Sequence, residues 1–65
     1  MTPQEIKRRR EELGLTVDEL AFALNLTEAE LMAIEAGESR LHLSPRFLEA
    51  FDEFEEKVFG TYVGA

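Results

Sequence analysis

A repeated phrase, a Thr followed three positions later by a Glu, constrains the fold of this chain more than any other feature. It occurs as TVDE at residues 16–19 and again as TEAE at residues 27–30. In such a capping box the Thr hydroxyl accepts an unpaired backbone N–H at a helix start, and the Glu carboxylate accepts the N–H of the capping residue. Two helices are therefore predicted, over residues 17–24 and 28–36.

The segment between these helices is very short, because only Asn25 and Leu26 separate them. Asn tolerates the left-handed backbone conformation of a tight turn at modest cost. Gly37 supplies the left-handed stop that commonly ends a helix. The pattern predicts a helix, a tight turn and a second helix, which is the helix-turn-helix arrangement of DNA-binding domains when the two helices cross steeply.

Two further helix starts flank this unit. TPQE at residues 2–5 is a third capping box with Pro at the first helical position, and Ser44-Pro45 is an N-cap followed by Pro. They predict helices over residues 3–13 and 45–59, the last ending at Gly60, with a frayed tail over residues 61–65. The predicted fold class is all-α: one domain over residues 1–60, a compact bundle of four or five short helices.

Composition limits what else the chain can be. Its 65 residues lie near the lower limit for a core that folds without metals or disulfides, and the absence of cysteine excludes a disulfide scaffold and a thiolate metal site. No apolar run approaches the length needed to span a bilayer. We therefore expect a soluble cytoplasmic protein with no cofactor and no membrane partner.

Nothing in the sequence indicates an enzyme. It contains no glycine-rich phosphate loop, no nucleophile–base constellation and no ligand cluster, and helix caps and solvated faces account for its carboxylates. His42, the single histidine, has no second ligand type nearby and is interpreted as a surface loop residue. We expect no catalytic residue and no metal site.

The central unit resembles the Cro/C1-type (XRE-family) helix-turn-helix domain of phage repressors. The resemblance covers about residues 6–54 and is carried by Leu13-Gly14-Leu15-Thr16, Leu20-Ala21, Leu24, Leu26-Thr27, Leu31, Ile34-Glu35 and Gly37. It implies a lambda-repressor-like fold and a sequence-specific DNA-binding transcriptional regulator, with the helix over residues 28–36 in the major groove. One departure is the loop after Gly37, because the next Pro-started helix begins eight residues on and not about four.

The resemblance also implies a structural ion pair. Arg10 lies at the margin of the apolar face of the first predicted helix, where a half-buried guanidinium requires a partner. In the family an Arg at this place pairs with a Glu at the end of the recognition helix. Arg10 and Glu35 occupy those two places.

The outward face of the predicted recognition helix lacks the usual base-reading side chains. It carries Ala29, Met32, Ala33 and Ala36, flanked by Glu28, Glu30 and Glu35. Arg, Lys, Gln and Asn, which ordinarily read purine edges, are absent between Thr27 and Gly37. The base contacts still possible are of two kinds. Ala29, Ala33 or Met32 can contact a thymine methyl group, and Glu28 can accept a hydrogen bond from a cytosine amino group.

A DNA interface must then rely on methyl contacts, on DNA shape and on phosphate contacts. The Gln that often starts the second helix in the family is Val17 here, so only backbone N–H groups are available there to hold a phosphate. The candidate DNA-binding residues are Arg8, Arg10, Val17, Thr27, Glu28, Ala29, Met32, Ala33 and Arg40.

Charge leaves a second function open. The net charge is −7, whereas a DNA-binding domain normally carries a basic footprint. A patch of small residues and a Met rimmed by acids also suits a protein partner. The alternative is a helix-turn-helix fold repurposed as an acidic protein-interaction module or inhibitor, including a DNA mimic, that does not bind DNA.

The last predicted helix has a broad apolar face, formed by Phe47, Leu48, Phe51, Phe54 and Val58, which is interpreted mainly as core. The C-terminal end of this apolar face extends beyond the surface that the three shorter helices can cover. We therefore expect a homodimer contact there, formed by Phe54, Val58, Phe59, Tyr62 and Val63.

Three apolar residues lie outside these faces. Leu41 and Leu43 alternate along the loop and are expected to pack onto the core. Phe22 falls on the outer side of its helix, either exposed or covered by the C-terminal tail or a partner.

Overall fold

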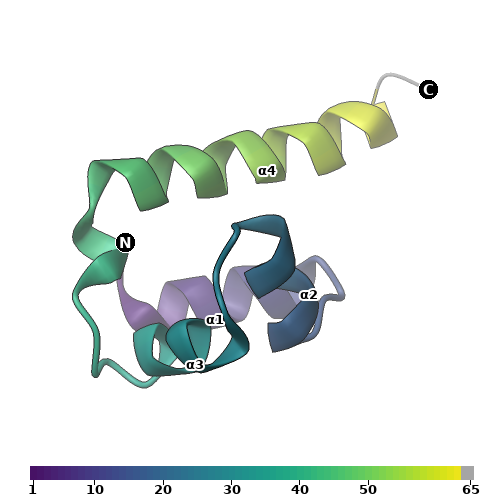
Figure 1. Cartoon of the computed structure of the whole chain (residues 1–65). Helices are drawn as coiled ribbons and strands as arrows, with labels where there is room; N and C mark the ends of the chain where they lie inside the picture. The colour runs from purple at the N-terminus through teal and green to yellow at the C-terminus, as the bar shows by residue number, and fades with distance from the viewer. Residues whose placement is uncertain (64–65) are drawn as a thin grey trace.

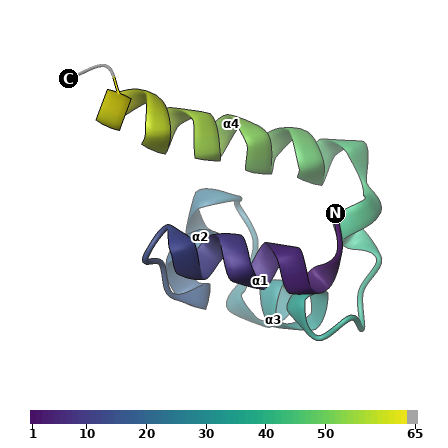
Figure 2. The ribbon, with the colours of Figure 1, turned by 180° about the vertical axis from the view of Figure 1, so that it is seen from behind.

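The computed structural model describes residues 1–63, and their side chains as far as Val58. Its elements are the helices α1 (Pro3–Glu12), α2 (Val17–Ala23) and α3 (Glu28–Glu35), the 3₁₀ turn η1 (Leu41–Leu43) and the long helix α4 (Pro45–Val63). No strand occurs within residues 1–63. The predicted all-α fold with a central helix-turn-helix is therefore confirmed. Figures 1 and 2 show α1, α2 and α3 as one body and α4 running along one side of it.

All three predicted capping boxes form. The hydroxyls of Thr2, Thr16 and Thr27 accept the N–H groups three residues on, at 3.2, 3.1 and 3.1 Å. The glutamates at those positions accept the Thr N–H groups in return, at 3.5, 2.8 and 2.8 Å. Each helix start thus satisfies its own backbone donors locally, and the predicted starts of α1, α2 and α3 are correct.

The turn between α2 and α3 is closed by the backbone. Asn25 has φ 60°, and the Leu26 N–H donates to the Ala21 carbonyl at 2.8 Å. At the end of α3, Gly37 has φ 78° and its N–H donates to Ile34, while the Glu38 N–H donates to Ala33. This pairing is a Schellman motif, which requires a left-handed residue just after the helix.

Every α-helix contributes to one small core. Its buried residues are Ile6 from α1, Leu20 and Ala21 from α2, Leu31 and Ile34 from α3, and Phe47 and Phe51 from α4. The two Phe rings lie 6.0 Å apart in a tilted arrangement. Burial of each large side chain stabilises the fold by roughly 1.5–3 kcal/mol. This core fixes the position of α3 against α1.

Two details of the C-terminal half differ from the predictions. Helix α4 continues to Val63, so the predicted end at Phe59 is wrong, and residues 64–65 of the predicted frayed tail lie outside the described residues. Glycine permits the left-handed conformation that stops a helix but also accepts the right-handed one, at about 1 kcal/mol relative to Ala. Gly60 therefore does not by itself end α4.

Leu41 and Leu43 do not join the core, because they are 38% and 58% exposed. The expectation that both side chains pack onto the core assumed an extended loop, in which alternate residues point to the same side. Instead η1 is a tight turn in which the Leu43 N–H donates to Arg40 and the Ser44 N–H to Leu41. Residues two apart in a 3₁₀ turn point about 240° apart, so the two side chains cannot both face inward.

Candidate nucleic-acid interface

Arg10 joins α1 to the end of α3. Its Nε donates to Glu35 Oε2 at 2.8 Å and its Nη2 to Glu35 Oε1 at 3.1 Å, a two-pronged geometry that suits guanidinium and carboxylate. Its Nη1 donates to the Leu15 carbonyl at 2.9 Å. The hydrogen bond with Glu35 raises the pKa of Arg10 above its ordinary value. The structure thus brings together the two residues that the family resemblance pairs.

This pair already engages Arg10 within the protein. The side chains of Arg10 and Glu35 are only 10% and 9% exposed. All three guanidinium nitrogens donate within the protein. A phosphate contact by Arg10 stays a prediction, and such a phosphate would compete with these hydrogen bonds.

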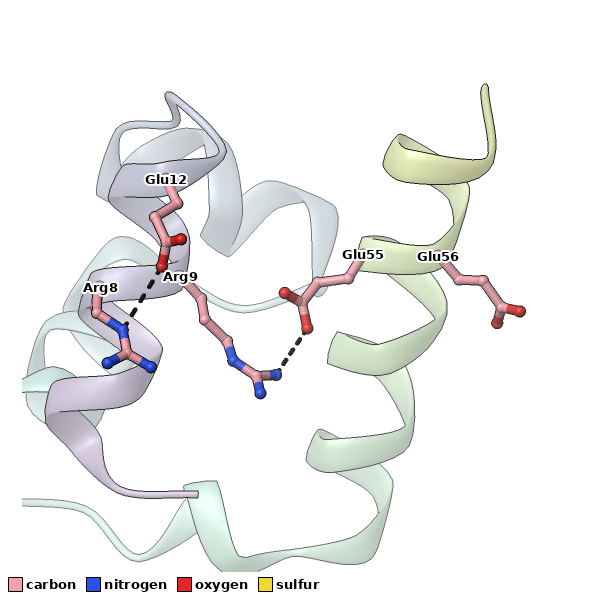
Figure 3. A pocket seen from close by; sticks show the side chains of 5 residues that line it. All are labelled: Arg8, Arg9, Glu12, Glu55 and Glu56. Carbon is pink, nitrogen blue, oxygen red and sulfur yellow. Dashed lines mark hydrogen bonds and ion pairs between the residues drawn. The ribbon is translucent and has the colours of Figure 1, made fainter. Parts of the chain in front are cut away.

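The neighbouring cations Lys7 and Arg8 line different hollows of the surface. Arg8 lines the hollow between α1 and α4, together with Arg9, Glu12, Glu55 and Glu56. Figure 3 shows Arg8 paired with Glu12 on its own helix and Arg9 reaching across to Glu55 on α4. Arg8 is therefore not among the side chains beside α3.

Lys7 was not among the candidate residues of the sequence analysis. It lines an open recess together with Arg10, Val17, Met32, Glu35 and Ala36. Its side chain is exposed and forms no ion pair within the described part of the chain. The signal was present in the sequence, because Lys7 and Arg10 are three positions apart and so share one side of α1.

This recess collects the parts that a DNA interface needs. It joins the first residue of α2, Val17, to Met32 and Ala36 on the outer side of α3 and to Lys7 on α1. Val17 is half-buried there. The sequence interpretation placed Val17 and Met32 in one interface, and the structure brings them together.

The remaining candidates on α3 face solvent. Glu28 and Ala29 are exposed, Ala33 is half-buried and Met32 is 54% exposed. Thr27 is exposed, but its hydroxyl and N–H are both used in the capping box with Glu30. The outer side of α3 is thus available to a ligand, with the apolar and acidic character that the sequence predicts.

Residues 6–51 match a family model described as helix-turn-helix, of the XRE type. The chain belongs to this family. The match includes the turn at Asn25, the pair Arg10–Glu35 and all seven buried core residues. The comparisons with curated proteins and with solved structures found no match.

Arg40 lies on the loop that follows α3 of this helix-turn-helix domain. It is exposed at the N-cap of η1, and its side chain forms no ion pair among the described residues. It is not one of the residues that line the recess with Lys7. Arg40 therefore remains available as a separate phosphate contact, on the loop that follows α3.

The residues expected in a dimer contact are only partly described. Phe54 and Val58 are half-buried, and Phe54 packs against the core. The side chains of Phe59, Tyr62 and Val63 lie outside the described residues. Phe22 of the helix-turn-helix is 87% exposed, so no described part of the chain covers it.

A metal centre and a membrane-spanning helix are both absent from the described residues. They contain no group of three or more His, Asp or Glu side chains placed to hold a metal ion. None of the helices described is both long enough and apolar enough to cross a membrane. Among the described residues, the His42 ring forms one hydrogen bond, between its Nδ1 and the Ser39 carbonyl at 2.9 Å.

Proposed function

We propose that this chain is a sequence-specific transcriptional regulator of the Cro/C1 type that places α3 in the DNA major groove. The family match supports DNA binding in general. The observation that carries the finer proposal is the recess in which Lys7, the start of α2 and the outer side of α3 meet. The proposal places the protein in the cytoplasm, with double-stranded DNA as its partner.

Lys7 and Arg40 are the proposed phosphate contacts. Both are exposed, and neither forms an ion pair among the described residues. Arg10 is committed to Glu35, and Arg8 lines the hollow on the α4 side. Few cations face the DNA and the net charge is −7, so binding is expected to be weak and is best measured at low salt.

The adjacent residues Lys7 and Arg8 provide the test. The salt dependence of binding to random duplex DNA is measured by fluorescence anisotropy for the parent, Lys7→Ala and Arg8→Ala. Each phosphate contact contributes about 0.9 to the slope of log K against log salt. If α3 enters the groove, Lys7→Ala flattens the slope by about that amount and Arg8→Ala leaves it unchanged. If the two variants change the slope equally, the proposed orientation with α3 in the groove is contradicted.

A second candidate function is a protein-interaction module or inhibitor that does not bind DNA. The observation that favours it is the exposed apolar patch formed by Ala29, Met32 and Ala36 on a chain with charge −7. Its partner would present an apolar surface with basic residues around it. If no duplex is bound at ~20 mM salt, where electrostatic attraction is least screened, the result favours this second function.

We also propose that two copies associate along the far half of α4. The half-buried Phe54 and Val58 leave apolar surface there. Val58→Asp should then lower the molar mass measured by sedimentation to that of a single chain, while Glu53→Asp, on the solvent side of the same helix, leaves it unchanged. A parent that already sediments as one chain would contradict the proposal.

A further inference from the structure

The outer side of α3 presents a single polar side chain that is not already used. Of its three glutamates, Glu30 accepts the Thr27 N–H at 2.8 Å and Glu35 is held by Arg10. Glu28 is exposed and has no hydrogen bond or ion pair among the described residues. A carboxylate only accepts hydrogen bonds at neutral pH, so no side chain of α3 can donate one to a base.

Met32 is the longest apolar side chain on this surface. It is 54% exposed and lies at the edge of the recess that contains Lys7 and Ala36. Its neighbours Ala29 and Ala33 extend only one methyl group from the backbone. Met32 is therefore the apolar α3 side chain that extends furthest toward a ligand docked on this side.

The base edges in the major groove differ in what they require. Guanine presents two acceptors, N7 and O6, and two-pronged recognition of adenine also requires a donor for N7. Thymine presents its C5 methyl group, which requires only apolar contact. A flexible thioether side chain adapts well to such a small apolar group. The chemistry of α3 therefore matches thymine and not the purines.

We propose that Met32 determines specificity by contacting the C5 methyl of a thymine in the bound site. This inference rests on the proposed function, because it requires α3 to lie in the major groove. It goes further by naming the base, the atom and the residue. Sites preferred by this chain contain a T·A pair where Met32 docks, and guanine is disfavoured next to Glu28.

The test replaces thymines by deoxyuridine, which lacks only the methyl group. A preferred duplex is first selected from a randomised pool with the full chain, and each thymine is then replaced in turn. Loss of one buried methyl contact, worth ~0.8 kcal/mol, weakens binding about fourfold. We expect this loss at one or two thymines and no change at the others.

Two variants assign the effect to a residue. Met32→Ala should bind the thymine and deoxyuridine duplexes equally well. Leu43→Ala, which also truncates an exposed apolar side chain but lies on η1, should keep the fourfold difference. If Met32→Ala keeps the difference, or if no thymine is sensitive, the inference is wrong while the DNA-binding function stands. If no duplex is bound at all, both are wrong.

Discussion

Arg10 on α1 and Glu35 at the end of α3 form a two-pronged ion pair in which both side chains are about nine-tenths buried. The pair links α3 to α1. Both residues also line the recess that contains Lys7 and Met32. A structural contact therefore determines how the proposed recognition surface is presented.

Removal of one member of this pair should be costly. Glu35→Ala leaves a buried guanidinium without its carboxylate, and the free energy of unfolding should fall by about 3 kcal/mol. Arg10→Met combined with Glu35→Leu removes both charges and should recover much of that loss. The free energy of unfolding of each variant is measured by urea denaturation, with circular dichroism as the signal. A Glu35→Ala variant as stable as the parent would show that the pair contributes nothing.

The contact between Arg9 and Glu55 should contribute less. Their atoms Nη1 and Oε1 lie 2.9 Å apart, but the pair is more exposed than Arg10–Glu35. Glu55→Ala should cost under about 1 kcal/mol. Glu56→Ala is the matched control, because Figure 3 shows Glu56 pointing away from Arg9. Thermal denaturation should show a lower midpoint for Glu55→Ala only, and equal midpoints would exclude a specific contribution.

The left-handed conformation of Asn25 should make this position sensitive to substitution. At φ 60° a residue with a Cβ is strained, and Asn is among the few that tolerate it. Asn25→Ala should destabilise the protein by about 1 kcal/mol, whereas Asn25→Gly should be neutral or stabilising. The denaturant midpoint should be lowest for Asn25→Ala, and that of Asn25→Gly should equal or exceed that of the parent. If Asn25→Ala has the highest midpoint of the three, the strain argument is contradicted.

Glu28 should oppose DNA binding through its charge. Glu28→Gln removes a negative charge from the exposed start of α3 and adds a donor that can pair with adenine. Affinity for random duplex at low salt should rise several-fold. Glu49→Gln on α4 changes the net charge equally and should have a smaller effect. If both variants gain the same affinity, only the total charge matters and α3 does not face the DNA.

Features whose partners lie within a few residues could be predicted from the sequence. Each capping box places its Thr and Glu three residues apart, so the starts of α1, α2 and α3 follow from local hydrogen bonds. The turn at Asn25 and the stop at Gly37 depend on single backbone conformations. These local features were sufficient to predict the helix-turn-helix and its place within residues 6–51.

Which helix face meets which neighbour depends on how the helices pack, and sequence spacing does not give this. Lys7, Arg8 and Arg10 lie on one helix turn, and their sequence spacing gives their relative directions but not the positions of α3 and α4. Packing of α4 along one side of the bundle placed Arg8 in the hollow beside it, while Lys7 came to line the recess beside α3. Packing of α3 against α1 turned the Arg10 guanidinium toward Glu35, so that only 10% of the side chain stays exposed.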